Sequence, residues 1–166
     1  HTLLLSALCR NLILWDAIQP TDQWIRSCFS DILLPSWDGT WGRRGADMIA
    51  GSSNDEIVQC SFEAVLAGAC MSIGFRYAGT FFLPAYQILT KYVKYFSWIR
   101  GHQYAQSSQV KFFNPQERHS QHHTPLPAFP LFSVKLAEMC LNSVAIALSM
   151  VMAGTGHLGT FKLLRQ

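Results

Sequence analysis

The 166-residue sequence carries little charge: Asp, Glu, Lys and Arg together make up 14% of it, well below the quarter or so typical of soluble domains. The formal net charge of +3 has no clustered source, because Arg43-Arg44 is the longest basic run. Aromatic residues do not alternate with basic ones along any segment. The sequence therefore does not support nucleic-acid binding.

Motifs of catalysis and of ligand binding are also missing. There is no Gly-x-Ser-x-Gly elbow, and the glycine-bearing turns lack the strand and the Lys-Ser/Thr of a phosphate loop. His102, His119, His122 and His123 match no zinc spacing. The five cysteines form no CxxC pair, and most fall on apolar helical faces, which indicates a reducing, intracellular setting. The sequence predicts no catalytic residue, no cofactor and no metal site.

Hydrophobic residues are abundant at 49%, so many helices must be buried on several sides or lie in lipid. The length suits one domain. A stretch read as AVLAGACMSIGFRYAGT, from Ala64 to Thr80, has a second, weaker copy, SVAIALSMVMAGTG, from Ser143 to Gly156. The copies align at a constant offset of 75 residues, with Gly79 over Gly154.

In each copy a helix rich in small residues runs into Ala-Gly-Thr, and a second apolar segment follows. This pattern predicts an all-α fold, a helix-turn-helix solenoid with irregular loop insertions. Two kinds of structural position are expected. A glycine inside a helix costs about 1 kcal/mol of stability relative to alanine, so its presence indicates that close packing against a neighbouring helix recovers this cost. A glycine just after a helix suits a left-handed C-terminal cap. The packing positions are Gly68 and Gly74, and the turn positions are Ala78, Gly79, Ala153 and Gly154.

The chain divides into five predicted segments. They are a helical lead-in (1–35), an irregular connection (36–53), a first repeat helix pair (54–100), a flexible insertion (101–132) and a second repeat helix pair (133–166), truncated at its C-terminal end. The chain is accordingly expected to be a fragment of something longer.

Helix boundaries follow from prolines and caps. The lead-in is predicted to hold one helix from Thr2 to Ile18, ended by Pro20, and a second that starts at a Thr21 cap and runs through Leu33. Ser53, with Glu56 three residues later, predicts the start of a long helix.

The segment 101–132 is rich in Pro, His, Gln and Ser, which favours flexibility. It contains Thr124-Pro125, the minimal proline-directed phosphorylation dipeptide, so Thr124 is a candidate modification site. Arg76, the lone charge in a long uncharged stretch, needs a carboxylate, helix-end carbonyls or water. A structural role is the favoured interpretation, with a partner contact as the alternative.

A membrane-embedded transporter or channel fragment is the alternative hypothesis. The 23 residues between Glu138 and Lys162 carry no charge and could cross a bilayer core of about 30 Å, with 141–161 as the span. Against it, the Ala-Gly-Thr-Gly turn would fall inside the hydrocarbon, and the other copy is interrupted by Arg76 and Pro84. We therefore favour a solenoid that packs outside the membrane over a membrane-spanning protein.

The residues of the two copies, AGACMSIGFRYAGT (67–80) and LNSVAIALSMVMAGTGHL (141–158), resemble proteasome/cyclosome repeats. The lead-in LCRNLILWDAIQP (8–20) is similar to the segment that precedes them. This family occurs in large subunits of the anaphase-promoting complex and of the proteasome base, and the former are the more similar. The segments 36–51 and 101–132 do not match the family.

The resemblance implies a non-catalytic scaffold of a multi-subunit E3 ubiquitin ligase, which controls the metaphase–anaphase transition and mitotic exit in cell division. It implies that the repeats position other subunits, namely the cullin–RING module and tetratricopeptide-repeat proteins, and the substrate-recruiting coactivator. It implies a location in nucleus and cytoplasm. The matched residues are packing glycines and alanines, so no partner-binding residue is carried over.

Overall fold

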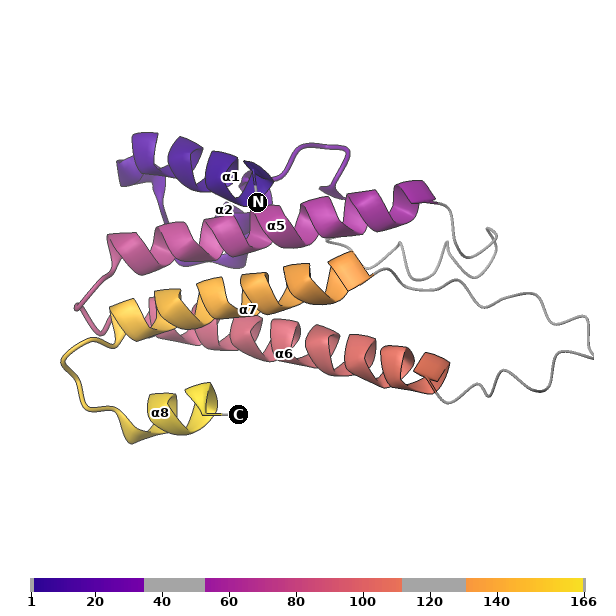
Figure 1. The fold of residues 1–166 in the computed structure, drawn as a ribbon. Coiled ribbons are helices and arrows are strands. Elements are labelled where there is room, and N and C mark those ends of the chain that lie inside the picture. Colours follow the sequence, from indigo (N-terminus) through magenta and orange to yellow (C-terminus); the bar gives the residue numbers. More distant parts are fainter. Residues whose placement is uncertain (1, 35–52, 112–130, 166) are drawn as a thin grey trace, which may run out of the picture.

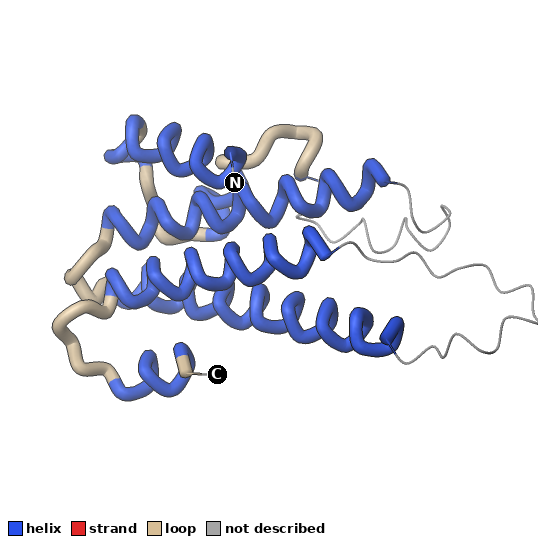
Figure 2. The backbone as a smooth tube through the Cα atoms, viewed as in Figure 1, coloured by secondary structure: helices blue, strands red, loops and turns tan. Residues whose placement is uncertain are grey.

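The structure is a computed structural model that describes residues 2–34, 53–111 and 131–165 (Figure 1). Within these ranges every regular element is a helix and no strand occurs (Figure 2), so the predicted all-α fold is confirmed. The long helices are α5 (Ser53–Arg76), α6 (Leu83–Lys111) and α7 (Leu131–Val151). The short ones are α1 (Thr2–Ile13), η1 (Trp15–Ala17), α2 (Asp22–Ser27) and α8 (Leu158–Leu164).

The lead-in helices are shorter than predicted. The expected single helix to Ile18 is wrong, because α1 ends at Ile13 and the 3-10 turn η1 follows. This turn changes the chain direction and lets Ile18, only 1% exposed, enter the core.

The cap at Thr21 is confirmed, since its Oγ1 accepts from the amide of Trp24 at 3.2 Å. The expected continuation of this helix through Leu33 is wrong, because α2 ends at Ser27. There the side chains of Ser27 and Cys28 both donate to the carbonyl of Trp24, which competes with further helical hydrogen bonding.

Helix α5 begins at Ser53, where the sequence predicts a start. The next, α6, continues to Lys111, so the placement of 101–111 in a flexible insertion is wrong. Gly101 is a single helix-weakening residue there, and the Gln, Ser, Ala and Lys residues that follow it tolerate a helix as far as Lys111. Residues 35–52 and 112–130, and with them Thr124, His119, His122 and His123, lie outside the described residues.

The long helices pack in layers. Helix α5 lies between α1 and α7, and α6 packs mainly on α7 and only lightly on α5, its neighbour in sequence (Figure 1). The fully buried side chains come from the three long helices, from α2 and from the segment before α2. They include Ile18, Ile25, Leu66, Ile73, Leu89, Phe96, Val144 and Leu148.

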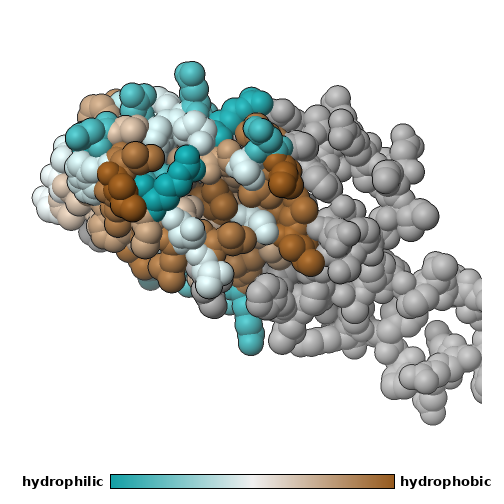
Figure 3. Space-filling view, turned by 90° about the horizontal axis from the view of Figure 1, so that it is seen from above, coloured by the Kyte–Doolittle hydropathy of each residue, from teal (hydrophilic) through white to brown (hydrophobic). Residues whose placement is uncertain are grey.

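The outer side of α1 leaves apolar side chains uncovered. Leu5 is 54% exposed and Ile13 is 83% exposed, although Leu4 on the same helix is buried against the core. Figure 3 looks onto this side of the molecule and shows hydrophobic surface among the polar patches. The helical layers therefore end here in an apolar surface.

One helix in the described ranges is long and apolar enough to cross a membrane, at 57–76. It forms the central layer, and 67% of that stretch is buried inside the protein, which accounts for its composition. The span considered at 141–161 is not one helix, because α7 ends at Val151 and α8 begins only at Leu158.

Candidate functional site: the repeat turns and their helix contacts

The threonines of the two Ala-Gly-Thr turns make the same hydrogen bonds. In the first, the Thr80 hydroxyl donates to the carbonyl of Tyr77 at 2.8 Å and accepts from the amide of Phe82 at 3.3 Å. In the second, the Thr155 hydroxyl makes the equivalent bonds at the same two distances, 2.8 Å and 3.3 Å, with residues 152 and 157. Every partner is shifted by the 75 residues of the sequence alignment. The repeat is thus present in backbone geometry as well as in sequence.

Backbone conformation matches too. Gly79 and Gly154 both have positive φ, at 68° and 79°. Two residues later each turn again has a positive φ, 51° at Phe81 and 61° at Gly156. Only glycine adopts this region without steric cost, so Phe81 holds a conformation that its side chain disfavours. The contacts of Phe81 with the neighbouring repeat explain why the conformation is kept.

The first turn is bonded directly to the second repeat. The amide of Gly79 donates to the carbonyl of Met150 at 2.8 Å, and the amide of Phe81 donates to that of Val151 at 3.2 Å. The last carbonyls of a helix have no partner within it, so the first turn caps the C-terminus of α7. One repeat thereby fixes where the first helix of the next repeat ends.

Small residues let the helices approach closely. A Cβ atom placed on Gly74 would lie 2.6 Å from both Cα and Cβ of Ala147 on α7. A Cβ atom on Gly68 would lie 2.6 Å from the carbonyl oxygen of Leu4 and 3.0 Å from Cβ of Ala7, both on α1. Helix α5 therefore contacts a different neighbour through each of its two interior glycines.

Buried polar groups add specificity to these contacts. Asn11 on α1, 4% exposed, donates to the Ser72 hydroxyl on α5 at 3.2 Å, and Ser72 donates to the carbonyl of Gly68 at 2.8 Å. Moving α1 away from α5 would take the acceptor from the buried Asn11 amide group, whereas Ser72 would keep its bond to Gly68 on its own helix. The pair sets the register of the two helices.

Glu63, 3% exposed, lies where α5, α6 and α7 meet. Burial raises the pKa of its carboxyl, and the hydrogen bond from Gln59 at 3.0 Å only partly opposes this. Burial, and after it this nearby carboxyl, raise the pKa of the Tyr95 phenol on α6 and of the Cys140 thiol on α7 to about 12. Cys140 is thus a buried packing residue with little thiolate at neutral pH.

The Thr80 hydroxyl offers a test of the turn. Thr80→Val is expected to lower the free energy of unfolding by about 1 kcal/mol, because the Tyr77 carbonyl and the Phe82 amide each lose a partner. Thr80→Ser keeps the hydroxyl and should cost much less. Thr155→Val should match Thr80→Val, as urea denaturation followed by circular dichroism would show. A loss at one threonine only would contradict the equivalence of the turns.

Glu63 gives a pH-dependent prediction. Its folded-state pKa lies above the ordinary value of 4.5, so its stabilising contribution is present below that pH and is lost as pH rises through the raised pKa. Glu63→Gln should therefore stabilise the protein at pH 7.5 by about 1 kcal/mol, and the advantage should vanish near pH 4.5. Thermal unfolding of both proteins across this range tests it. Groups that titrate equally in both proteins cancel when their stabilities are subtracted. A stability difference that does not change with pH would contradict a raised pKa at Glu63.

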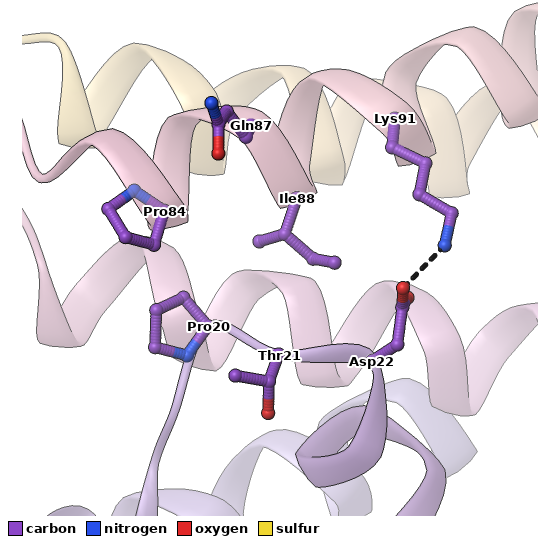
Figure 4. A pocket seen from close by; sticks show the side chains of 7 residues that line it. All are labelled: Pro20, Thr21, Asp22, Pro84, Gln87, Ile88 and Lys91. Carbon is purple, nitrogen blue, oxygen red and sulfur yellow. Dashed lines mark hydrogen bonds and ion pairs between the residues drawn. The ribbon is translucent and has the colours of Figure 1, made fainter.

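A groove of about 310 Å³ lies between the chain before α2 and the first turns of α6 (Figure 4). Pro20 and Pro84 face each other at one end of the groove, and the Ile88 side chain lies between these prolines and the Asp22–Lys91 pair at the other end. Asp22 closes one end by an ion pair with Lys91 at 2.7 Å and accepts from the Tyr92 hydroxyl at 2.6 Å. Although burial acts to raise it, these two hydrogen bonds hold the pKa of Asp22 below its ordinary value. The polar groups of the groove join α2 to α6.

Arg76 ends α5 with a carboxylate partner, as a structural role requires. Its guanidinium lies 3.2 Å from the Asp16 carboxylate and 5.5 Å from the Trp15 ring centroid. Both partners belong to η1. The three side chains connect the end of α5 to the turn that follows α1, although the pair is exposed and contributes little energy by itself.

The six predicted structural positions fall into two groups. Gly68 and Gly74 lie in the helix contacts of α5, and the other four, Ala78, Gly79, Ala153 and Gly154, lie in the exposed turns. No group of three metal-ligating side chains occurs within 2–34, 53–111 and 131–165. Sequence reasoning missed the cross-repeat cap by Phe81 and the burial of Glu63. The alignment at an offset of 75 residues places Phe81 over Gly156, and this aligned glycine could have indicated the unusual backbone conformation at Phe81.

Comparison with known proteins gives a consistent picture. The family described as the APC1 fifth domain matches residues 1–166. The chain is 32% identical over 168 residues to "Anaphase-promoting complex subunit 1" of Arabidopsis thaliana, which covers 98% of the chain and 9% of that protein. It is 30% identical over 164 residues to the protein of the same name from Homo sapiens, with 98% and 7% covered. "Negative regulator of mitosis" of Emericella nidulans is 30% identical over 166 residues, with 98% and 6% covered.

Proposed function

Because this chain belongs to the family of the APC1 fifth domain, we propose that it is a non-catalytic scaffold segment of an anaphase-promoting complex, a multi-subunit ubiquitin ligase. The chain spans less than a tenth of the length of these relatives, of which those from Arabidopsis thaliana and Homo sapiens bear the name of that complex. Its own contribution is a rigid spacer and contact surface within the subunit. The observation that carries this proposal is the cap that the first turn makes on α7.

That cap supports a scaffold because it fixes one repeat relative to the next through backbone atoms. Gly79 and Phe81 hold the end of α7, while Gly74 brings α5 against Ala147. Stacked units that contact only their neighbours give an extended surface whose shape follows from the repeat geometry. Such a stack positions other proteins without a pocket of its own.

The partners proposed for the whole subunit are the cullin–RING catalytic module, tetratricopeptide-repeat subunits and the substrate-recruiting coactivator. In this role the subunit acts as a molecular adaptor in the nucleus and cytoplasm of dividing cells, on the pathway of ubiquitin conjugation. In this role the contact surfaces of the stack bind the partners, and no catalytic group is required.

A purification from mitotic cells tests the proposal. The full-length subunit that carries this sequence is tagged and recovered without detergent, and its partners are identified by mass spectrometry. Recovery of cullin, RING and tetratricopeptide-repeat subunits is the expected result. Retention in the membrane pellet without those partners would overturn the proposal and revive the membrane alternative.

A matched pair of variants sharpens this test. Gly74→Ala disturbs the α5–α7 contact, whereas Gly101→Ala on α6 adds a methyl group where nothing lies within 4 Å. If the stack positions the partners, the first variant should recover less of them per molecule of subunit and the second should recover normal amounts. Equal recovery with both would contradict the role of the stack.

A further inference from the structure

Helix α6 carries charge of one sign only. Its 29 residues include Lys91, Lys94, Arg100 and Lys111 but neither Asp nor Glu. Opposite charges three or four positions apart commonly stabilise the exposed face of a helix, and α6 has no such pair within itself. Its positive charge is therefore matched only by groups from outside the helix.

The exposed residues of α6 form a single stripe. Gln87, Lys91, Lys94 and Trp98 are all exposed and recur every three or four residues, which places them on one face of the helix. These four residues are called the basic stripe below. Trp98 is 59% exposed, although tryptophan is well buried on average, and it is the residue type most enriched among the strongest contacts of protein interfaces. The basic stripe thus combines positive charge with an apolar anchor.

The basic stripe is a lateral surface of the helical stack and not one of its ends. Helix α6 packs on α7, and α2 adjoins another side of it through the hydrogen bonds of Asp22 with Lys91 and Tyr92. On a further side Tyr86 meets the ring of His157, the residue that caps α8, with 5.3 Å between the ring centroids. The basic stripe is the side that these three neighbours leave open, so it would face outward in a stack of any length.

A carboxylate of the protein itself shows how this surface binds an acidic group. Oδ2 of Asp22 lies 2.7 Å from Nζ of Lys91, and Oδ1 accepts from the Tyr92 hydroxyl at 2.6 Å. The Lys91 ammonium also lies 5.3 Å from the centroid of the Tyr92 ring. Three residues further along, Lys94 makes no ion pair with any residue that the structure describes. Lys94 therefore offers an unmatched charge to a second carboxylate.

The groove between α2 and α6 adjoins the basic stripe (Figure 4). Gln87 and Lys91 belong to both, while Pro20, Pro84 and Ile88 give the groove its apolar lining. Between the proline of α6 and the tryptophan of the stripe the helix rises about 21 Å, which about six residues of an extended chain would cover. The surface therefore has the length of a short linear segment, with an apolar contact at each end and two lysines between them.

We propose that the basic stripe and the adjoining groove bind a short, acidic, extended segment of another protein of the complex. Carboxylates of this segment pair with Lys91 and Lys94, one of its apolar side chains enters the groove, and another covers Trp98. The inference rests on the proposed scaffold function and deepens it, because it names the contact surface and the chemistry of one partner segment.

Charge selects this occupant over the alternatives. A second copy of this chain would bring one basic stripe against another, and like charges oppose association. A purely apolar helix would remove water from Lys94 without supplying a counter-charge, which is costly. Nucleic acids are bound through many phosphate contacts, far more than two lysines provide.

Photo-crosslinking in the full-length subunit tests the proposal. Gln87 is replaced by benzoylphenylalanine, which leaves both lysines in place, and the complex purified from mitotic cells is irradiated. The expected product joins residue 87 to another protein of the complex, within a segment in which Asp and Glu outnumber Lys and Arg. A crosslink to a neutral or basic segment, to the same polypeptide, to a second copy or to nucleic acid would overturn the proposal, and so would the lack of any crosslink.

Charge reversal shows whether the crosslink depends on the basic stripe. In the subunit with the photo-crosslinker, Lys94→Glu should lower the crosslink yield about 10-fold, because an attraction becomes a repulsion, whereas Lys94→Arg should keep most of it. Lys135→Glu is the matched control, since Lys135 is exposed on α7 and lies outside the basic stripe. It should leave the yield unchanged. Equal yields from Lys94→Glu and Lys135→Glu would overturn the proposal.

A labelled peptide measures the binding directly. The crosslinked segment is synthesised with a fluorescein label, and its anisotropy is followed as the purified full-length subunit is added. Lys94→Glu and Trp98→Ala should each weaken binding about 10-fold. A peptide with Asn and Gln in place of Asp and Glu should not bind, and equal binding of this neutral peptide would overturn the proposal.

The outcome for the basic stripe is separable from that for the scaffold. If the subunit purifies with its partners but residue 87 gives no crosslink to an acidic segment, the basic stripe is not a docking surface and the scaffold role stands. If the unsubstituted subunit purifies with no partner, the scaffold role itself fails.

Discussion

Replacing Gly74 with alanine is expected to lower the free energy of unfolding by about 2 kcal/mol. A single methyl group there would lie 2.6 Å from both Cα and Cβ of Ala147, and backbone cannot move aside as a long side chain can. Overpacking of a well-packed contact costs about 1–3 kcal/mol, and this one lies between the two helices that carry the repeats. The helix preference for alanine, worth about 1 kcal/mol, acts in the opposite direction and is outweighed.

Gly101→Ala is the matched control for Gly74→Ala. Gly101 also lies inside a helix, but no atom lies within 4 Å of the added methyl group. The same substitution should therefore raise stability by about 1 kcal/mol through helix propensity alone. Urea denaturation of both variants gives the comparison. If both substitutions stabilised the protein, α5 and α7 could not approach as closely as the structure has them.

Gly68→Ala is expected to have the second largest effect and to act on α1. The added Cβ would lie 2.6 Å from the carbonyl oxygen of Leu4, so α1 must move away from α5. That movement would also break the buried hydrogen bond between Asn11 and Ser72. We expect a loss of about 1–2 kcal/mol, because overpacking and a buried Asn11 amide group left without its acceptor outweigh the helix preference for alanine.

Hydrogen exchange separates this effect from that of Gly74. In Gly68→Ala the amides of α1 should exchange about tenfold faster or more, while those of α7 keep most of their protection. In Gly74→Ala the amides of α5 and α7 should both lose protection. Uniform loss in both variants would mean that the layers do not respond separately, contrary to a stack in which each helix contacts only its neighbours.

Periodicity and repetition were enough to predict the helical class and the repeat unit. The spacing of small and apolar residues in 64–80 and 143–156 predicts helices that end at Ala-Gly-Thr, and α5 and α7 do end there. A pattern repeated in one chain is informative because both copies must satisfy the same backbone geometry. The aligned threonines Thr80 and Thr155 make the same hydrogen bonds for that reason.

Helix ends away from the repeat were harder to predict, because they depend on contacts that sequence does not contain. Ile18 continues the helical spacing of α1, yet the chain leaves the helix after Ile13 and Ile18 is buried beyond a 3-10 turn. Gly101 and the polar residues after it resemble a loop, but a helix as long as α6 continues through one glycine. The acceptors of the Gly79 and Phe81 amides lie on α7, far away in the sequence, so these hydrogen bonds could not be predicted without knowing how α7 packs.

The measurement that tests the central claim most directly is amide exchange at Gly79 and Phe81, resolved by nuclear magnetic resonance. The claim is that successive repeats are joined by backbone hydrogen bonds from a turn to the end of the next helix. Both amides lie in an exposed turn, so they would exchange rapidly unless the Met150 and Val151 carbonyls hold them. The account predicts protection at both that falls in Gly74→Ala, where α7 is displaced. Exchange at the rate of an unprotected amide in the unsubstituted protein would contradict it.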